Sequence, residues 1–306
     1  MDEVPRTHEA FARSNGIELC YDTFGDAAAP PLLLIMGLAA QMIAWDDEFC
    51  TALARRGLRV IRFDNRDIGR STHFAHAGVP DVGAALMAVM QGKPATAPYL
   101  LSDMAADAVG LLDTLQIDRA HVVGASMGGA IAQTLAIEHP ARLHTLTSIM
   151  ATTGAPGLPP PTPEAVAVLL KPTPSDQAGY FESYVQTWKV LRAGSFPLDE
   201  ARDLTRAGQN FARGLNPPGV ARQLAAVLAS GSRRDALTAV KLPTLVIHGD
   251  ADPLVPVACG VDTANAVPAA KLLLIKGMGH ALPISMWPQI IDAICEHTSS
   301  APATRQ

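Results

Sequence analysis

The chain has 306 residues, of which 48% are hydrophobic and 17% charged, and its formal net charge is −5. A chain of this length and composition can bury the core of a globular domain. It has no basic stripe and no polybasic segment, which argues against a nucleic-acid partner and against an anionic membrane surface. The amino terminus does not resemble a secretory signal, and no apolar run reaches the roughly 18 residues of a membrane helix. We therefore expect a cytoplasmic protein.

The first half of the chain alternates strand-like with helical patterns. Residues 16–24 alternate apolar and polar side chains with period two, which is typical of a half-buried strand near a sheet edge. Short apolar runs typical of strands in a covered parallel sheet follow at 31–35, 59–63, 121–123 and 143–150. Helical patterns lie between them at about 43–56, 100–116 and 127–138. This order predicts βαβ units and an α/β fold with a mostly parallel sheet.

The strand pattern is interrupted over residues 152–236. A proline-rich stretch at 156–163 is followed by several amphipathic helical segments, with no strand-like run among them. A helical insertion at one point of a sheet is a common way to build a lid over a site, although simple packing is the alternative. We interpret 152–236 as a helical cap.

The α/β pattern resumes after the insertion. A strand is expected at 242–248, a helix at about 257–266, a strand at 271–275 and a last helix at about 286–297. The predicted organisation is therefore a core formed by 1–151 and 237–298, the cap at 152–236, and a frayed tail at 299–306.

The four cysteines are scattered along the chain. Cys20, Cys50, Cys259 and Cys295 lack the spacing of a metal site, and we expect no bound metal. Reduced, buried thiols are the preferred interpretation, with a stray disulfide as the alternative.

Residues 124–128, Gly-Ala-Ser-Met-Gly, match the G-x-S-x-G pattern of a nucleophile elbow. The pentapeptide alone is a weak signal, because an N-capping serine after a glycine gives the same letters. It lies, however, between an apolar strand pattern and a strong helix former, which is the strand–turn–helix context that the motif requires. Ser126 is therefore the predicted nucleophile, at a helix N-terminus that favours developing negative charge.

A serine hydroxyl needs an adjacent general base. Of nine histidines, His280 lies in a glycine-rich loop (277–283) after a strand and before the last helix. Loops at the carboxyl ends of parallel strands are where catalytic groups of such sheets collect. His121 and His248 lie on predicted strands, where a structural role is the safer interpretation.

An acidic residue that orients the histidine should lie between the serine and the histidine in the chain. The segment 245–256 offers Asp250 and Asp252 after a strand, and either carboxylate could accept from an imidazole N–H. Asp250 could equally stabilise the turn itself.

Acyl transfer also needs two backbone N–H groups directed at the tetrahedral oxygen. The residue after the nucleophile, Met127, supplies one candidate. The loop that follows the 31–35 strand supplies the other, because Gly37 permits a turn there and places the Leu38 N–H as a donor.

Together these residues resemble the α/β-hydrolase superfamily over nearly the whole chain. Residues 64–71 are similar to the family's D-x-R-G-x-G-x-S turn, with Asp67 where a glycine is usual, and we assign this turn no catalytic role. The Met36-Gly37 start of the early loop, residues 45–49 and residues 277–283 resemble the aclacinomycin methylesterase group. The resemblance implies hydrolysis of a small-molecule carboxylic ester, perhaps a methyl ester, without a cofactor. It also favours Asp252 over Asp250.

The predicted mechanism is two-step acyl transfer. Ser126 attacks the ester carbonyl, His280 takes its proton, Asp252 orients His280, and the Leu38 and Met127 amides bind the oxyanion. Alternatives on the same triad are hydrolysis of a C–C bond and a cofactor-free perhydrolase or haloperoxidase reaction. A non-enzymatic ligand-binding protein with this fold is a further alternative. Four aromatic cap residues could shape an apolar pocket or belong to the core: Tyr180, Phe181, Trp188 and Phe211. The sequence leaves the oligomeric state open.

Overall fold

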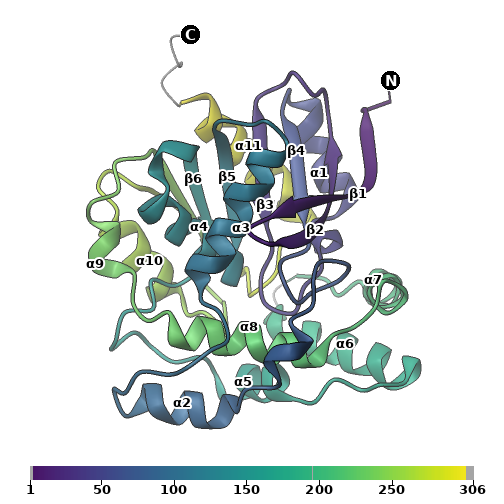
Figure 1. Ribbon diagram of the computed structural model, residues 1–306, viewed down its shortest axis with the longest axis vertical. Helices are drawn as coiled ribbons and strands as arrows, with labels where there is room; N and C mark the ends of the chain where they lie inside the picture. The colour runs from purple at the N-terminus through teal and green to yellow at the C-terminus, as the bar shows by residue number, and fades with distance from the viewer. Residues whose placement is uncertain (1–2, 195, 301–306) are drawn as a thin grey trace.

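A computed structural model describes residues 3–194 and 196–300, and within them eight strands form one sheet (Figure 1). The order of strands across the sheet is β1-β2-β4-β3-β5-β6-β7-β8. Their bounds are β1 Arg6–Ser14, β2 Ile17–Phe24, β3 Pro31–Ile35, β4 Arg59–Phe63, β5 Ala120–Ala125, β6 Leu143–Ile149, β7 Thr244–Gly249 and β8 Lys271–Ile275.

The sheet is mostly parallel, which confirms the predicted fold class. β1 pairs antiparallel with β2, and β2 pairs antiparallel with β4. All pairings from β4 through β8 are parallel. The carboxyl ends of six strands therefore meet at one edge, and the loops that leave this edge can bring distant residues together.

Helices cover both faces of the sheet. Their bounds are α1 Asp47–Arg55, α2 Val82–Met90, α3 Leu101–Thr114, α4 Met127–Glu138, α5 Pro163–Leu170, α6 Gln177–Leu191, α7 Glu200–Arg213, α8 Pro217–Ala229, α9 Arg234–Leu237, α10 Val257–Ala266 and α11 Trp287–Ser299. Alternate residues of β3 point to opposite faces of the sheet. Leu33 and Ile35 pack with α3 and α4 on one face. Leu32 and Leu34 pack with α1 and α11 on the other. β3 reads as a continuous apolar run because both of its faces are buried.

Two elements were not predicted from the sequence. β1 is an edge strand with only one neighbour, and its sequence is mostly polar, with Phe11 half exposed. α2 is apolar all round and buries only Ala85, so it lacks the one-sided stripe that identifies an amphipathic helix. The tail predicted at 299–306 lies outside the described residues from 301 onward, and α11 continues through Ser299.

Helices α5 to α9 occupy the interval between β6 and β7, where the helical insertion was expected. In Figure 1, α5, α6, α7 and α8 lie together below the sheet, with α2 beside them. α9 returns to the core and packs against α4 and α10. The unpredicted α2 packs on α8.

The turn after β4 is joined to α8 by a buried ion pair. Asp67 has a φ of 69° and is fully buried. Its carboxylate accepts from Arg222 Nε at 2.8 Å and from Arg222 Nη2 at 2.7 Å, and from the Tyr99 hydroxyl at 2.7 Å. Burial alone would raise the pKa of Asp67, but the hydrogen bonds from Arg222, the Phe74 amide and Tyr99 hold that pKa below its usual value. The residue that departs from the family turn thus fastens α8 to the core.

Replacing Asp67 by glycine should therefore destabilise the protein. Glycine suits the positive φ, but its introduction leaves the Arg222 guanidinium buried without its carboxylate, which typically costs about 3–5 kcal/mol. We expect the free energy of unfolding, measured by urea denaturation, to fall by about 3 kcal/mol. Adding Arg222→Met should cost less in the Asp67→Gly background than in the wild type. A glycine variant as stable as the wild type would contradict this account.

The described residues also bear on disulfides, metal sites and membrane spans. All four cysteines are free thiols, with Cys20, Cys50 and Cys259 buried and Cys295 half-buried. Within residues 3–194 and 196–300, no group of three or more His, Cys, Asp or Glu side chains is arranged to hold a metal ion. In the same ranges, no helix has both the length and the apolar character to cross a membrane.

Candidate active site

Ser126 lies on the sharp turn between β5 and α4, at the carboxyl edge of the sheet. Its backbone has φ 56° and ψ −122°, a strained conformation for a residue with a side chain. Its N–H donates to the Ile149 carbonyl at the end of β6, at 2.9 Å, which fixes the turn against the sheet. The strand–turn–helix arrangement expected for the pentapeptide is present, and the side chain is half-buried.

The flanking glycines are required by close backbone approach. A Cβ on Gly124 would clash with the Gly128 carbonyl, and a Cβ on Gly128 would clash with the Ile35 carbonyl at the end of β3. The motif therefore packs the start of α4 directly onto β5 and the loop after β3. This packing brings Ser126 to that loop.

His280 reaches Ser126 from the loop after β8. His280 Nε2 lies 2.9 Å from Ser126 Oγ, and His280 Nδ1 lies 2.7 Å from Asp252 Oδ2. An ionised carboxylate can only accept, so Nδ1 carries the proton and Nε2 is left to accept from the serine hydroxyl. Both His280 and Asp252 are buried, at 5% and 6% exposure, which shields this chain of hydrogen bonds from water.

The two candidate acids have different partners. Asp252 contacts His280 through one oxygen, and its other oxygen accepts from the amides of Leu254 and Val255 at 2.9 and 2.8 Å. These two amides fix the carboxylate in the plane that the imidazole needs. Asp250 instead accepts from the Gly277 amide at 2.5 Å, so its side chain joins the loop after β7 to the turn after β8. The residues by themselves left this choice open, and only the family resemblance favoured Asp252.

Two other buried histidines have hydrogen-bond partners outside Ser126, although His248 Nε2 also lies 3.8 Å from Asp252 Oδ2. The His121 side chain lies 3.0 Å from Thr145 Oγ1, and burial lowers its pKa to about 4. His248 Nε2 lies 2.7 Å from the Val255 carbonyl, and burial lowers its pKa as well. Neither side chain reaches Ser126.

The loop after β3, where one oxyanion donor was predicted, passes beside the nucleophile. A Cβ added to Gly37 would lie 3.0 Å from Ser126 Cβ, so the loop passes directly against the nucleophile. In the part of the chain that the structure describes, the Leu38 and Met127 amides donate no hydrogen bond to a protein acceptor. Neither amide is therefore occupied by a protein acceptor.

A cavity of about 120 Å³ adjoins the site. Three of its lining residues, Met36, Met150 and Ala281, are chain neighbours of Gly37, Ile149 and His280. Its remaining walls include the aromatic rings of Trp45, Phe49, Tyr184, Trp188 and Trp287. Of the four cap aromatics considered from the sequence, only Trp188 lines this cavity. Tyr180, Phe181 and Phe211 instead contact one another between α6 and α7 in edge-to-face or tilted arrangements, with ring centroids 5.9–6.4 Å apart.

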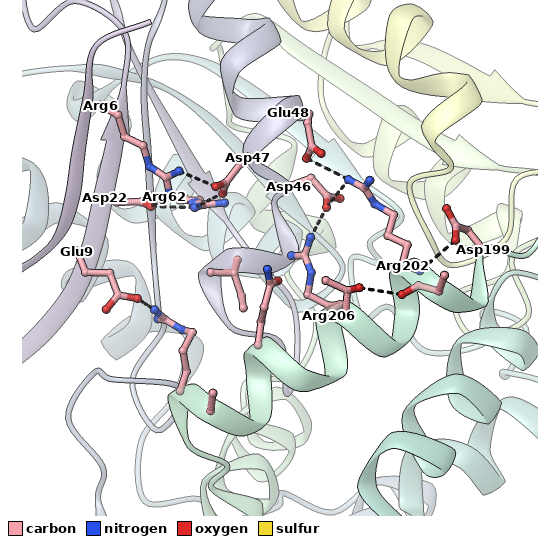
Figure 2. A pocket seen from close by; sticks show the side chains of 16 residues that line it. Arg6, Glu9, Asp22, Asp46, Asp47, Glu48, Arg62, Asp199, Arg202 and Arg206 are labelled. Carbon is pink, nitrogen blue, oxygen red and sulfur yellow. Dashed lines mark hydrogen bonds and ion pairs between the residues drawn. The ribbon is translucent and has the colours of Figure 1, made fainter. Parts of the chain in front are cut away.

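A larger cleft of about 750 Å³ lies between α7 and the edge formed by β1, β2 and α1 (Figure 2). Its walls are charged, and Figure 2 shows Asp46 between Arg202 and Arg206, which are both on α7. These three residues also line the smaller cavity, so the ion pairs separate the two spaces. Ser126 and His280 line neither the cleft nor the smaller cavity, and the smaller cavity approaches the site through their neighbours Met36, Met150 and Ala281.

The similarity of the chain to known proteins agrees with this fold and site. Residues 30–285 match the alpha/beta hydrolase fold family. The chain belongs to this α/β-hydrolase family. It is 33% identical to rhodomycin D methylesterase of Streptomyces peucetius, over 93% of this chain and 96% of that protein. The resemblance to methylesterases of the family is thereby confirmed.

The chain is also similar to other hydrolases at lower sequence identity. The chain is 29% identical to a 2-hydroxymuconate semialdehyde hydrolase of a Pseudomonas strain, over 66% of this chain and 67% of that protein. Among solved structures, the enol-lactonase of Burkholderia xenovorans superposes with a TM-score of 0.71 at 22% identity, covering 95% of this chain and all of that one. The meta-cleavage product hydrolase of Pseudomonas fluorescens gives 0.75 at 19% identity, covering 95% of this chain and 97% of that one. These two structural matches show the fold alone.

Proposed function

We propose that this α/β hydrolase cleaves carboxylic esters through an acyl-enzyme on Ser126. The observation that carries the proposal is the continuous hydrogen-bond chain from Ser126 Oγ through His280 to Asp252, at 2.9 and 2.7 Å. A nucleophile, a base and an orienting acid within hydrogen-bond reach form the arrangement that acyl transfer needs. The similarity to a rhodomycin D methylesterase over nearly the full length supports an ester as the substrate, and a methyl ester in particular.

In the first half-reaction, Ser126 Oγ attacks the carbonyl carbon while His280 Nε2 takes the hydroxyl proton. The Leu38 and Met127 amides bind the oxygen that becomes negative, and Asp252 stabilises the imidazolium. His280 then returns the proton to the departing alcohol as the C–O bond breaks. The products are the alcohol and an acyl-enzyme on Ser126.

In the second half-reaction, water replaces the alcohol. His280 Nε2 removes a proton from this water, whose oxygen attacks the acyl carbonyl, and the same two amides hold the oxyanion. Collapse of the tetrahedral species expels Ser126 Oγ, which regains its proton from His280. Every proton is thus carried by one imidazole, and no cofactor takes part in the scheme.

We propose that the segment 152–236 acts as a cap that sets which esters enter. A contact between this segment and the catalytic loop supports the role. The backbone N–H of His280 donates to the carbonyl of Leu191, at the end of α6, at 2.7 Å. The cavity beside the site is walled by both core and cap aromatics, including Trp45 and Trp188. The aromatic part of this wall suits an apolar acyl or alcohol group, and the same cavity is also lined by five charged side chains, Asp46, Arg192, Arg202, Asp203 and Arg206.

A panel of esters tests the proposal. We expect turnover of p-nitrophenyl acetate and butyrate, and release of methanol from methyl esters with apolar or aromatic acyl groups.

C–C bond hydrolysis is the second candidate, favoured by the similarity to the 2-hydroxymuconate semialdehyde hydrolase. Cleavage of a vinylogous diketone with no turnover of any ester would replace the esterase assignment by the C–C assignment.

A further inference from the structure

The loop that passes Ser126 is held in place from the cap. Ala39 has a φ of 62°, a left-handed conformation that alanine rarely adopts. Its N–H donates to Oε1 of Gln223 on α8, at 3.2 Å. Gln223 is fully buried, and its Nε2 donates to the Arg66 carbonyl at 2.8 Å. One cap side chain therefore joins the loop after β3 to the turn after β4.

A second anchor lies on the other side of Leu38. Asn65 Nδ2, from the turn after β4, donates to the Met36 carbonyl at 2.8 Å. The loop is thus held just before Gly37 by Asn65 and just after Leu38 by Gln223. Between these two anchors, the Leu38 amide has no protein acceptor in the described part of the chain. The anchors fix the orientation of the peptide that presents this amide.

The Gln223 carboxamide is itself held in one orientation. Its Oε1 accepts from the Ala39 N–H. Its own donor is used by the Arg66 carbonyl, so the carboxamide cannot rotate without losing both bonds. Rotation would leave buried polar groups unpaired, at a cost that holds the side chain in place.

We propose that Gln223 is a positioning residue for the oxyanion donor at Leu38, so that a residue of the cap completes the catalytic geometry of the core. This role rests on the proposed ester hydrolysis. Because Gln223 sits on α8, the oxyanion loop takes its working shape only while α8 is seated on the core. The Arg222–Asp67 pair, next to Gln223 in the chain, keeps α8 seated.

The test compares two buried glutamines. Gln223→Met keeps the side-chain volume and removes both hydrogen bonds. Gln133→Met is the matched control, because Gln133 is equally buried and makes two side-chain hydrogen bonds, to Ser148 and Arg233, away from the loop. The readouts are kcat and KM on a p-nitrophenyl ester, the inhibition constant of a trifluoromethyl ketone, and the melting temperature. The ketone adds to Ser126 and leaves an oxyanion, so its affinity reports the oxyanion donors.

We expect Gln223→Met to lower kcat by about tenfold to a hundredfold, with KM changed less than about threefold. The ketone should bind more weakly by a similar factor. Gln133→Met should lose comparable thermal stability and keep kcat within about threefold of wild type. Gln223→Asn, which keeps the carboxamide but shortens the reach by one methylene, should show the same selective loss of kcat and serves if the methionine variant does not fold.

Equal kcat values and equal ketone affinities for the Gln223 and Gln133 variants would overturn the positioning role. That outcome is distinct from failure of the proposed function, which is read from Ser126→Ala in the same assay. If Ser126→Ala abolishes turnover while the Gln223 variants behave like the Gln133 control, ester hydrolysis stands and the role of Gln223 falls.

Discussion

Replacing Ser126 by alanine should lower kcat on a p-nitrophenyl ester by about 10⁴-fold or more. The variant keeps His280 and the proposed oxyanion amides, but it loses the hydroxyl oxygen that lies 2.9 Å from His280 Nε2 and attacks the carbonyl in the proposed mechanism. The backbone of the turn should persist, because Gly124 and Gly128 still provide the close packing and alanine has no larger side chain. Steady-state kinetics on purified wild type and variant, with circular dichroism as the check on folding, measure the effect.

Ser148→Ala is the control for this comparison. Ser148 is a buried serine on β6, and its hydroxyl accepts from Gln133 and not from His280. We expect this variant to lose about 1 kcal/mol of stability and to keep kcat within about threefold. Turnover by Ser126→Ala within tenfold of the wild type would remove Ser126 from the mechanism.

Asp252→Asn should lower kcat by about 10⁴-fold. An asparagine at this position can donate to His280 Nδ1, which favours the tautomer with the proton on Nε2 and leaves no base facing Ser126. The amides of Leu254 and Val255 would still hold the side-chain oxygen, so the geometry should change little. The loss should therefore be in kcat, with KM nearly unchanged.

Asp250→Asn is the matched control, because the two aspartates are two residues apart in one loop. Among the residues that the structure describes, the Asp250 side chain accepts a hydrogen bond only from the Gly277 amide, and an asparagine oxygen can accept the same bond. We expect kcat to change by less than about threefold. A large loss at Asp250 with a small one at Asp252 would reverse the assignment of the acid.

Much of the fold follows from local patterns in the sequence. The buried parallel strands are continuous apolar runs, and α4 begins directly after a glycine-flanked serine; both features depend on neighbours in the chain. β1 and α2 escaped prediction because each depends on a partner that the local pattern does not reveal. β1 is polar and is held by β2, and α2 packs on α8, which lies more than a hundred residues away.

The residues of the candidate site also differ in whether a local sequence pattern identifies them. Ser126 and His280 carry local signals, a glycine-flanked turn and a glycine-rich loop after a strand. The choice of Asp252 over Asp250 from residues alone was open, because both follow β7 and only the register of the loop turns one toward His280. Gln223 has no local signal at all. It is one of two adjacent polar residues on an otherwise apolar helix, and its bonds to Ala39 and Arg66 span more than 150 residues of chain.

Trapping the acyl-enzyme is the most direct test of the central claim. The protein is mixed with p-nitrophenyl butyrate, quenched in acid within milliseconds and analysed by intact mass and peptide mass spectrometry. Acyl transfer through Ser126 predicts one butyryl group per chain on the peptide that contains Ser126, and none in Ser126→Ala. Rapid nitrophenol release with no covalent adduct on the wild type at any quench time, or an adduct of equal amount in Ser126→Ala, would contradict it.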